Sequence, residues 1–248
     1  MAEHALAVVN LGKLFGGLAA VDGVSLNVAA GERRVLIGPN GAGKTTLFHC
    51  VTGTLKPSSG QVSLFGRDVT RLAEHRRTAL GMGRTFQITN VFPDLTLGEN
   101  LALAIVGTDR RKWVVHRPAE AFEEVRRQAL EGLARVGLEG RAQLPAKLVS
   151  YGERRQLELA LALNTGPKVL FLDEPCAGLS PAERQRISQM IADLPRSMTL
   201  LMIEHDMDVA LGLADRVTVL HQGRVILEGT PQEVRANPEV RDVYFGHA

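Results

Sequence analysis

The stretch RRVLIGPNGAGKTTLFHC, residues 33–50, places a glycine-rich loop between a β-like run and a helical pattern. Its central part, Gly38 to Thr45, matches G-x-x-x-x-G-K-[ST], a pattern in which backbone N–H groups surround phosphates at the start of a helix. The preceding strand and the following helix are the context that this pattern requires, so a glycine-rich turn of chance composition explains it poorly. The stretch therefore predicts an α/β fold with a phosphate-binding loop.

The candidate phosphate ligands follow from this loop. Lys44 would reach the β- and γ-phosphates of a nucleotide such as ATP, and the Thr45 hydroxyl would bind Mg²⁺. Backbone N–H groups and nearby polar side chains would hold the other phosphate oxygens. The expected set is Gly38, Asn40, Gly41, Gly43, Lys44, Thr45 and Thr46.

Composition narrows the class of protein. The 248 residues suit one large domain or a domain with a subdomain, and the hydrophobic content of 45% is ordinary for a globular chain. A net charge of +2 gives no nucleic-acid signal. The start, MAEHALAVVN, lacks the features of a signal peptide, and no apolar run approaches the ~18 residues that span a membrane. We expect no nucleic-acid partner and no direct membrane insertion.

The two cysteines, Cys50 and Cys176, have neither a disulfide framework nor metal-ligand spacing. We expect them to be small buried hydrophobic residues in a reducing cytosol.

Further along the chain, two continuous apolar runs end in polar groups. KVLFLDEP (168–175) and MTLLMIEHD (198–206) fit strands that are buried on both faces, as in a parallel sheet covered by helices. Residues 215–229 are typical of two strands joined by a hairpin turn at HQGR.

A helical segment interrupts this α/β core, because strand signals vanish from about Leu97 to Leu163. Since the interruption falls between two core strands, we expect an inserted subdomain rather than a separate domain. Residues 1–248 would form one domain, with the core at 1–87 and 164–248 and the helical subdomain at 88–163. Its apolar stripe comprises Phe122, Val125, Ala129, Leu133 and Val136.

Four polar residues near strand ends are candidates for chemistry. Asp173 can bind Mg²⁺, and the adjacent Glu174 can act as general base toward an attacking water. His205 could hydrogen-bond a γ-phosphate or orient the water, and Gln87, where the core gives way to helices, could touch Mg²⁺ or water. On local sequence alone, a structural histidine and an ordinary loop glutamine remain alternatives, as does a charged pair that simply reaches solvent.

A second helix start also has the character of an anion site. In LVSYGERRQLELALAL (148–163), Ser150 and Glu153 have the spacing of a capping box. Gly152 leaves the N–H groups of the first turn uncovered, so they could contact a phosphate.

The order of these motifs resembles the nucleotide-binding subunit of ATP-binding-cassette (ABC) transporters, over nearly the whole chain. The resemblance implies an α/β P-loop NTPase (RecA-like) core with an antiparallel β subdomain and an inserted α-helical subdomain. It implies catalytic roles for Gln87, Glu174 and His205, and a metal site of Thr45, Gln87 and Asp173. Phe15 matches the aromatic residue that stacks on adenine.

The resemblance also implies a role for the second anion site, at Ser150 and Gly152. In this family two cassettes pack head to tail, so Ser150 and Gly152 would contact the ATP of the partner. Tyr151 and Ser180 stand where many relatives have glycine and aspartate, which leaves open how the two sites communicate.

Three stretches point to one branch of the family: FGGLAAVDGVSL, GRTFQITNVFPDLTLGENL and EGTPQEVRANPEVRDVYFG. They look like the ATPases of importers for branched-chain amino acids and related polar solutes, including urea. The branch implies a second, different ATPase subunit, two membrane permeases and an extracytoplasmic solute-binding protein, with this chain peripheral on the cytoplasmic face of the inner membrane. The alternatives are a lipopolysaccharide or lipid exporter and a soluble ABC ATPase without a transport role.

Overall fold

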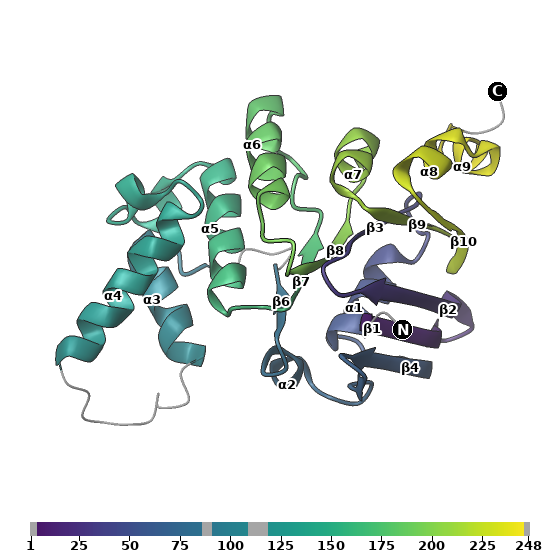
Figure 1. Ribbon diagram of the computed structural model, residues 1–248, viewed down its shortest axis with the longest axis horizontal. Coiled ribbons are helices and arrows are strands. Elements are labelled where there is room, and N and C mark those ends of the chain that lie inside the picture. The colour runs from purple at the N-terminus through teal and green to yellow at the C-terminus, as the bar shows by residue number, and fades with distance from the viewer. Residues whose placement is uncertain (1–3, 86–90, 109–118, 246–248) are drawn as a thin grey trace.

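The computed structural model describes residues 4–85, 91–108 and 119–245. Within them the chain forms two sheets that lie on either side of helix α1 (Lys44–Thr52), with more helices around them (Figure 1). The antiparallel sheet has the order β2-β1-β4-β5 and the larger sheet the order β10-β9-β3-β8-β7-β6. The strands are β1 (His4–Phe15), β2 (Leu18–Ala29), β3 (Arg33–Ile37), β4 (Ser59–Leu64), β5 (Arg67–Asp68), β6 (Met82–Arg84), β7 (Val169–Asp173), β8 (Thr199–Ile203), β9 (Arg216–His221) and β10 (Arg224–Gly229).

The larger sheet confirms the strand predictions. β3 pairs in parallel with β8 and β9, and β7 pairs in parallel with β6 and β8. Every residue of β3, β7 and β8 is buried, which is why β7 and β8 are mostly apolar, whereas β3 begins with two buried arginines, Arg33 and Arg34. β9 and β10 form the predicted antiparallel hairpin, whose turn places Gln222 and Gly223 at positive φ.

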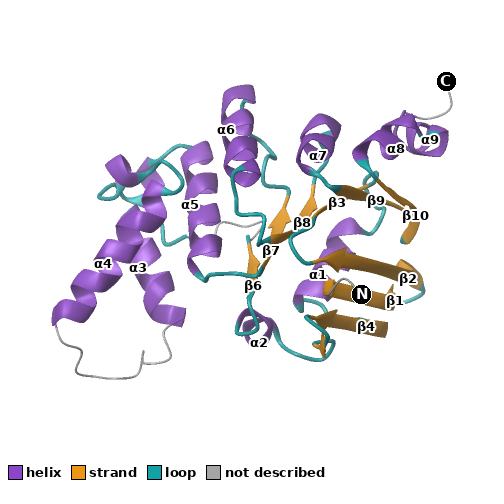
Figure 2. Cartoon of the chain, viewed as in Figure 1, coloured by secondary structure: helices purple, strands orange, loops and turns teal. Residues whose placement is uncertain are grey.

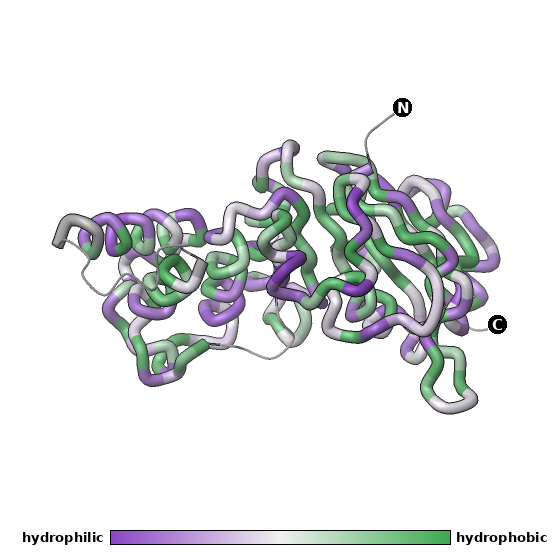
Figure 3. The backbone as a smooth tube through the Cα atoms, turned by 90° about the horizontal axis from the view of Figure 1, so that it is seen from below, coloured by the Kyte–Doolittle hydropathy of each residue, from purple (hydrophilic) through white to green (hydrophobic). Residues whose placement is uncertain are grey.

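Alternate residues of this sheet pack into two different cores. Leu36 and Phe171 face α1 and the antiparallel sheet, whereas Ile37 and Leu172 face the helices on the other side. This alternation is the period of two that strand geometry imposes. Figure 3 shows hydrophobic residues (green) concentrated along these strands.

The helices gather into two groups (Figure 2). Helices α3, α4 and α5 lie between β6 and β7 in the chain and occupy the end of the molecule away from the antiparallel sheet. Helices α6 to α9 follow the strands of the larger sheet. The helices besides α1 are α2 (Glu74–Thr78), α3 (Leu97–Thr108), α4 (Ala119–Ala134), α5 (Tyr151–Asn164), α6 (Pro181–Ala192), α7 (Met207–Leu213), α8 (Pro231–Ala236) and α9 (Pro238–Phe245).

The predicted stripe of the helical region is only partly correct. Ala129 and Leu133 on α4 are buried, and so is Val136, which lies beyond the end of the helix. Phe122 is 64% exposed, because it borders an open groove between α3 and α4 rather than the core. Among the described residues, no helix is both long enough and apolar enough to cross a bilayer.

Candidate functional site

The loop between β3 and α1 has a backbone that only glycine can adopt at two positions. Gly38 has φ +151° and Gly43 has φ +97°. A Cβ on Gly38 would overlap the carbonyl oxygen of Leu220, and one on Gly43 would overlap the carbonyl oxygen of Ala20. The loop therefore passes tightly between β9 and β2 and leaves its other side available to a ligand.

The start of α1 has the features of an anion site. Gly43 is the N-cap and provides no side-chain cap, so N–H groups of the first turn have no partner within the helix. Asn40 and Gly41 are exposed on the rim, and Thr45 and Thr46 lie half-buried in the first turn. A phosphate at this position would satisfy the N–H groups and the helix dipole together.

Lys44 is held across this loop. Its side chain is 4% exposed, and its Nζ donates to the carbonyl oxygens of Gly38 at 2.6 Å and Pro39 at 3.0 Å. Burial lowers the pKa of Lys44, while the charge of Glu174 opposes this shift. The ammonium group therefore lies at the loop, where the charge of Glu174, the residue directly after β7, acts on it.

Asp173, the last residue of β7, is fully buried, and neither of its carboxylate oxygens accepts a hydrogen bond within the described part of the chain. Arg84 is its nearest recorded cation, with an N–O distance of 4.0 Å. Burial raises the pKa of Asp173, and Arg84 opposes that rise. Buried carboxylate oxygens with unfilled acceptor sites fit a hard divalent cation such as Mg²⁺.

A dedicated protein cage for a metal is not seen. The described residues contain no cluster of three or more His, Cys, Asp or Glu side chains that could hold an ion. A site of one carboxylate and one hydroxyl, completed by phosphates and water, is the kind that Mg²⁺ uses in nucleotide enzymes.

Glu174 and His205 meet although 30 positions separate them in the sequence. Glu174 follows β7 and His205 follows β8, and His205 Nε2 lies 2.6 Å from Glu174 Oε1. Glu174 has φ +48°, a left-handed conformation that costs energy for a residue with a Cβ. This strain turns its carboxylate toward the histidine and the phosphate-binding loop.

Two buried charged residues of this region received no role from the sequence. Glu204 is 2% exposed and accepts hydrogen bonds from backbone N–H groups. Arg84 on β6 packs over the ring of Phe48 at 5.3 Å and donates to Thr52 Oγ1 at 3.2 Å. Glu204 belongs to the run MTLLMIEHD (198–206), but nothing in that run indicates that its side chain is buried.

The second helix start also forms as predicted. Ser150 Oγ accepts the Glu153 N–H at 3.2 Å, and the Glu153 carboxylate accepts the Ser150 N–H at 2.8 Å, which completes the capping box of α5. The amide of Gly152 faces the carboxylate of Glu183 from α6, and a Cβ on Gly152 would overlap that carboxylate. An internal carboxylate therefore already lies at this anion site.

The predicted residues form separate groups in one subunit. No recorded hydrogen bond or ion pair among the described residues joins Ser150 or Gly152 to the phosphate-binding loop. Phe15, at the end of β1, is 48% exposed, with Lys13 Nζ 5.1 Å from its ring centroid, so one face remains open for stacking. Gln87 lies outside the described residues.

Comparison with known proteins identifies the family of this chain. A family model described as ABC transporter matches residues 21–177, more than half of the chain. The chain belongs to the ABC transporter family. It is an ATP-binding cassette that hydrolyses ATP to drive transport.

Further comparisons agree with this family. A second family model, described as branched-chain amino acid ATP-binding cassette transporter, matches residues 224–248. The chain is 41% identical over 255 residues to the high-affinity branched-chain amino acid transport ATP-binding protein LivG of Salmonella typhimurium, covering 100% of both chains. It is 36% identical over 242 residues to the lipopolysaccharide export system ATP-binding protein LptB of Acidithiobacillus ferridurans, covering 97% of this chain and 96% of that one.

The fold is likewise that of a solved cassette. The crystal structure of the ADP conformation of MJ1267, an ATP-binding cassette of an ABC transporter, superposes with a TM-score of 0.86 at 31% identity. The match covers 98% of this chain and 99% of that chain. It confirms the predicted cassette fold of a P-loop core with an antiparallel β subdomain.

Proposed function

We propose that this cassette energises the import of branched-chain amino acids or related polar solutes. The supporting observation is the full-length similarity to LivG, together with the match of the C-terminal residues to the branched-chain model. The chain would act on the cytoplasmic face of the inner membrane with a second ATPase subunit, two membrane permeases and an extracytoplasmic solute-binding protein.

In this proposal the loop of Gly38–Thr46 binds the phosphates of ATP and Phe15 stacks on the adenine. Thr45, Asp173 and Gln87 would hold Mg²⁺, which would neutralise charge on the β- and γ-phosphates. Lys44, already fixed between two loop carbonyls, turns its ammonium toward the γ-phosphate.

The pair of Glu174 and His205 carries out the proton chemistry. Glu174 accepts a proton from the attacking water, and its 2.6 Å approach to His205 lets the imidazole orient the carboxylate and the γ-phosphate. The oxygen of the water bonds to phosphorus as the bond to the bridging oxygen of ADP breaks. The products are ADP and inorganic phosphate.

A second cassette completes each site. Within the described part of the chain, no hydrogen bond or ion pair joins Ser150 or Gly152 to the loop of their own subunit, yet they lie at a helix start suited to an anion. We assign this start to the γ-phosphate of the partner. Hydrolysis removes that shared phosphate and weakens the closed pair, which is a population shift driven by a ligand.

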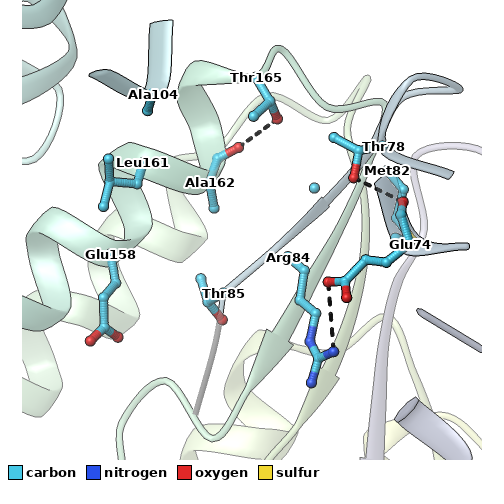
Figure 4. A pocket seen from close by; sticks show the side chains of 11 residues that line it. Glu74, Thr78, Met82, Arg84, Thr85, Ala104, Glu158, Leu161, Ala162 and Thr165 are labelled. Atoms are coloured by element: carbon cyan, nitrogen blue, oxygen red, sulfur yellow. Dashed lines mark hydrogen bonds and ion pairs between the residues drawn. The ribbon is translucent and has the colours of Figure 1, made fainter. Parts of the chain in front are cut away.

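The permeases would dock where the helical subdomain, which we assign to residues 88–163, meets the core. A cavity of 240 Å³ lies at this junction, between α2 and β6 on the core side and α3 and α5 on the other (Figure 4). Glu74 and Arg84 lie on one wall and Ala104 and Leu161 on the opposite wall. An open, mostly apolar cavity with a few charges suits a short helix of a partner.

The test is reconstitution of the chain with its permeases in proteoliposomes. Binding protein loaded with leucine, isoleucine or valine should raise the ATPase rate and drive uptake of the labelled amino acid. The similarity to LptB supports one alternative, export of lipopolysaccharide. Stimulation by lipopolysaccharide, with no response to loaded binding protein, would establish the alternative and overturn the import proposal.

A further inference from the structure

Glu204 is a buried carboxylate directly after β8, and its two oxygens accept from two different segments of backbone. Oε1 accepts the N–H of Cys176 at 3.1 Å, and Oε2 accepts the N–H of His205 at 3.2 Å. Its own N–H donates to the carbonyl of Leu36 at 3.4 Å, which ties it to the end of β3. The side chain thus sits where three strands of the sheet end.

The two segments that Glu204 joins carry the proposed catalytic pair. Cys176 comes two residues after Glu174, and His205 is the next residue along the chain. The Glu174 backbone is left-handed, with its N–H bonded to the Ile203 carbonyl at 3.0 Å. Above this frame, His205 Nε2 and Glu174 Oε1 lie 2.6 Å apart.

Among the described residues, the Glu204 carboxylate accepts from the backbone N–H groups of Cys176, His205 and Asp206 and from the Cys176 thiol, none of which is a cation. The recorded ion pairs of the described residues do not include it, and burial raises the pKa of its carboxyl against the hydrogen bonds from Cys176 and His205. A buried acid is costly, and it is compatible with a stable fold only when its acceptors are filled. With 2% exposure it has no access to a water or a nucleotide, so direct catalysis is excluded.

We propose that Glu204 is a positioning residue that fixes the Cys176 and His205 backbones relative to each other and thereby sets the approach of His205 to Glu174. The proposal rests on the roles proposed above for that pair. A hydrogen-bond clamp of this kind matters for rate, because a displacement of about 1 Å in a catalytic group can cost about 10²-fold.

The test is Glu204→Gln in the full chain. Glutamine has the same size but only one acceptor atom, so at most one of the two N–H groups keeps its partner and the other faces an NH₂ group. We expect kcat of the assembled transporter to fall by roughly 10-fold or more, while the affinity of the isolated subunit for ATP changes less than about twofold, because the phosphate-binding loop is untouched. Glu204→Asp keeps the charge but is one methylene shorter, so it should fall between the parent and Glu204→Gln.

A readout that does not use hydrolysis is the thiol of Cys176, which is 3% exposed. In a Cys50→Ala background, loss of the Glu204 carboxylate should increase the alkylation rate of Cys176 by roughly 10-fold, because the buried segment opens locally and because Glu204 no longer raises the pKa of the thiol. Glu32→Gln is a control, because Glu32 also accepts a backbone N–H, that of Ala29 at 2.9 Å, and additionally pairs with Arg34 at 2.6 Å, but lies at the opposite end of β3. This control should leave kcat and thiol reactivity unchanged.

Parental kcat and parental thiol reactivity in Glu204→Gln would overturn the proposal. So would equal losses in Glu204→Gln and Glu32→Gln, since these would reflect general stability. The thiol readout separates this proposal from the roles of Glu174 and His205. If Glu174→Gln kept full hydrolysis while Cys176 still became reactive in Glu204→Gln, the clamp would stand and the catalytic assignment would fail.

Discussion

Among single residues, Glu174 combines a left-handed backbone with a 2.6 Å contact between its Oε1 and His205 Nε2. Glu174→Gln keeps the shape of the side chain but removes its ability to accept a proton. We expect retained binding of Mg²⁺–ATP and a loss of hydrolysis of roughly 10²-fold or more. Lys44→Ala should instead weaken ATP binding itself. ATP titration and phosphate release distinguish the two, and a Glu174→Gln subunit with the parental rate would refute the assignment.

For single residues, the sequence predicts a role when the partners of the residue are close to it in the sequence. The phosphate-binding loop is such a case, because Gly38, Gly43 and Lys44 lie within one short loop, no more than six positions apart. Glu204 and Arg84 could not be predicted, since their partners are distant in sequence. Glu204 lies 28 residues from the Cys176 amide that it accepts, and only the pairing of β7 with β8 brings the two together.

Among the elements, the start of α5 gives the sharpest prediction. If it is only a capped helix end, Ser150→Ala should cost about 0.5–2 kcal/mol of stability and little else. If it binds the ATP of the partner, Gly152→Asp should abolish closure of the pair and hydrolysis, because a carboxylate would stand near the γ-phosphate. The change also meets Glu183, so the new carboxylate cannot withdraw toward α6.

The measurement pairs ATP affinity of the isolated subunit with the ATPase rate of the assembled transporter. Gly140→Asp is a control, because a side chain at Gly140 would meet open space. If a folded Gly152→Asp complex hydrolysed ATP at the normal rate, the start of α5 would be only a capped helix end and not a binding site for the ATP of the partner.

The capping boxes of α6 and α8 predict a dependence on pH. A hydrogen bond from the Ser180 side chain lowers the pKa of Glu183, and one from the Thr230 backbone lowers that of Glu233, each from an ordinary value of 4.5. A carboxyl with a lowered folded-state pKa stabilises the fold above pH 4.5, and this contribution is lost as pH falls through the lower value. Calorimetric Tm values between about pH 5 and 3 should therefore fall less steeply in Glu183→Gln and Glu233→Gln than in the parent. Identical slopes would contradict the prediction.

Helices and strands could be predicted from the sequence where their hydrophobic periodicity is strong. They could not be predicted where pairing with another strand determines their extent. β7 and β8 follow directly from their apolar runs. β1 extends to Phe15, beyond the mostly apolar run 5–11, because bulged antiparallel pairing with β2 continues past Gly12 and Lys13. β6 has only three residues and no periodic signal, and its strand character comes from its pairing with β7.

For the whole molecule, the proposed docking region predicts a separation of transport from nucleotide binding. Phe92 is 58% exposed and precedes α3, near the junction of the core and the helical residues. Phe92→Ala should lower solute transport by the assembled complex while ATP binding by the isolated subunit stays normal, since no phosphate ligand is involved. Phe122→Ala is a control of the same type on α4. Crosslinks from the permeases that reach only the phosphate-binding core would rule this region out as the docking surface.

The parallel sheet is shared by both hydrophobic cores, and this has a thermodynamic consequence. Because Leu36 and Ile37 are neighbours in β3 but belong to opposite cores, neither core can melt without withdrawing support from the other. We expect the antiparallel sheet and helices α6 and α7 to unfold in one cooperative transition, and the amides of β3 to exchange hydrogen only through global opening. Separate calorimetric transitions for the two layers would contradict this. Helices α3 and α4 pack on each other and on α5, so local opening should begin there and leave the nucleotide-binding layer intact.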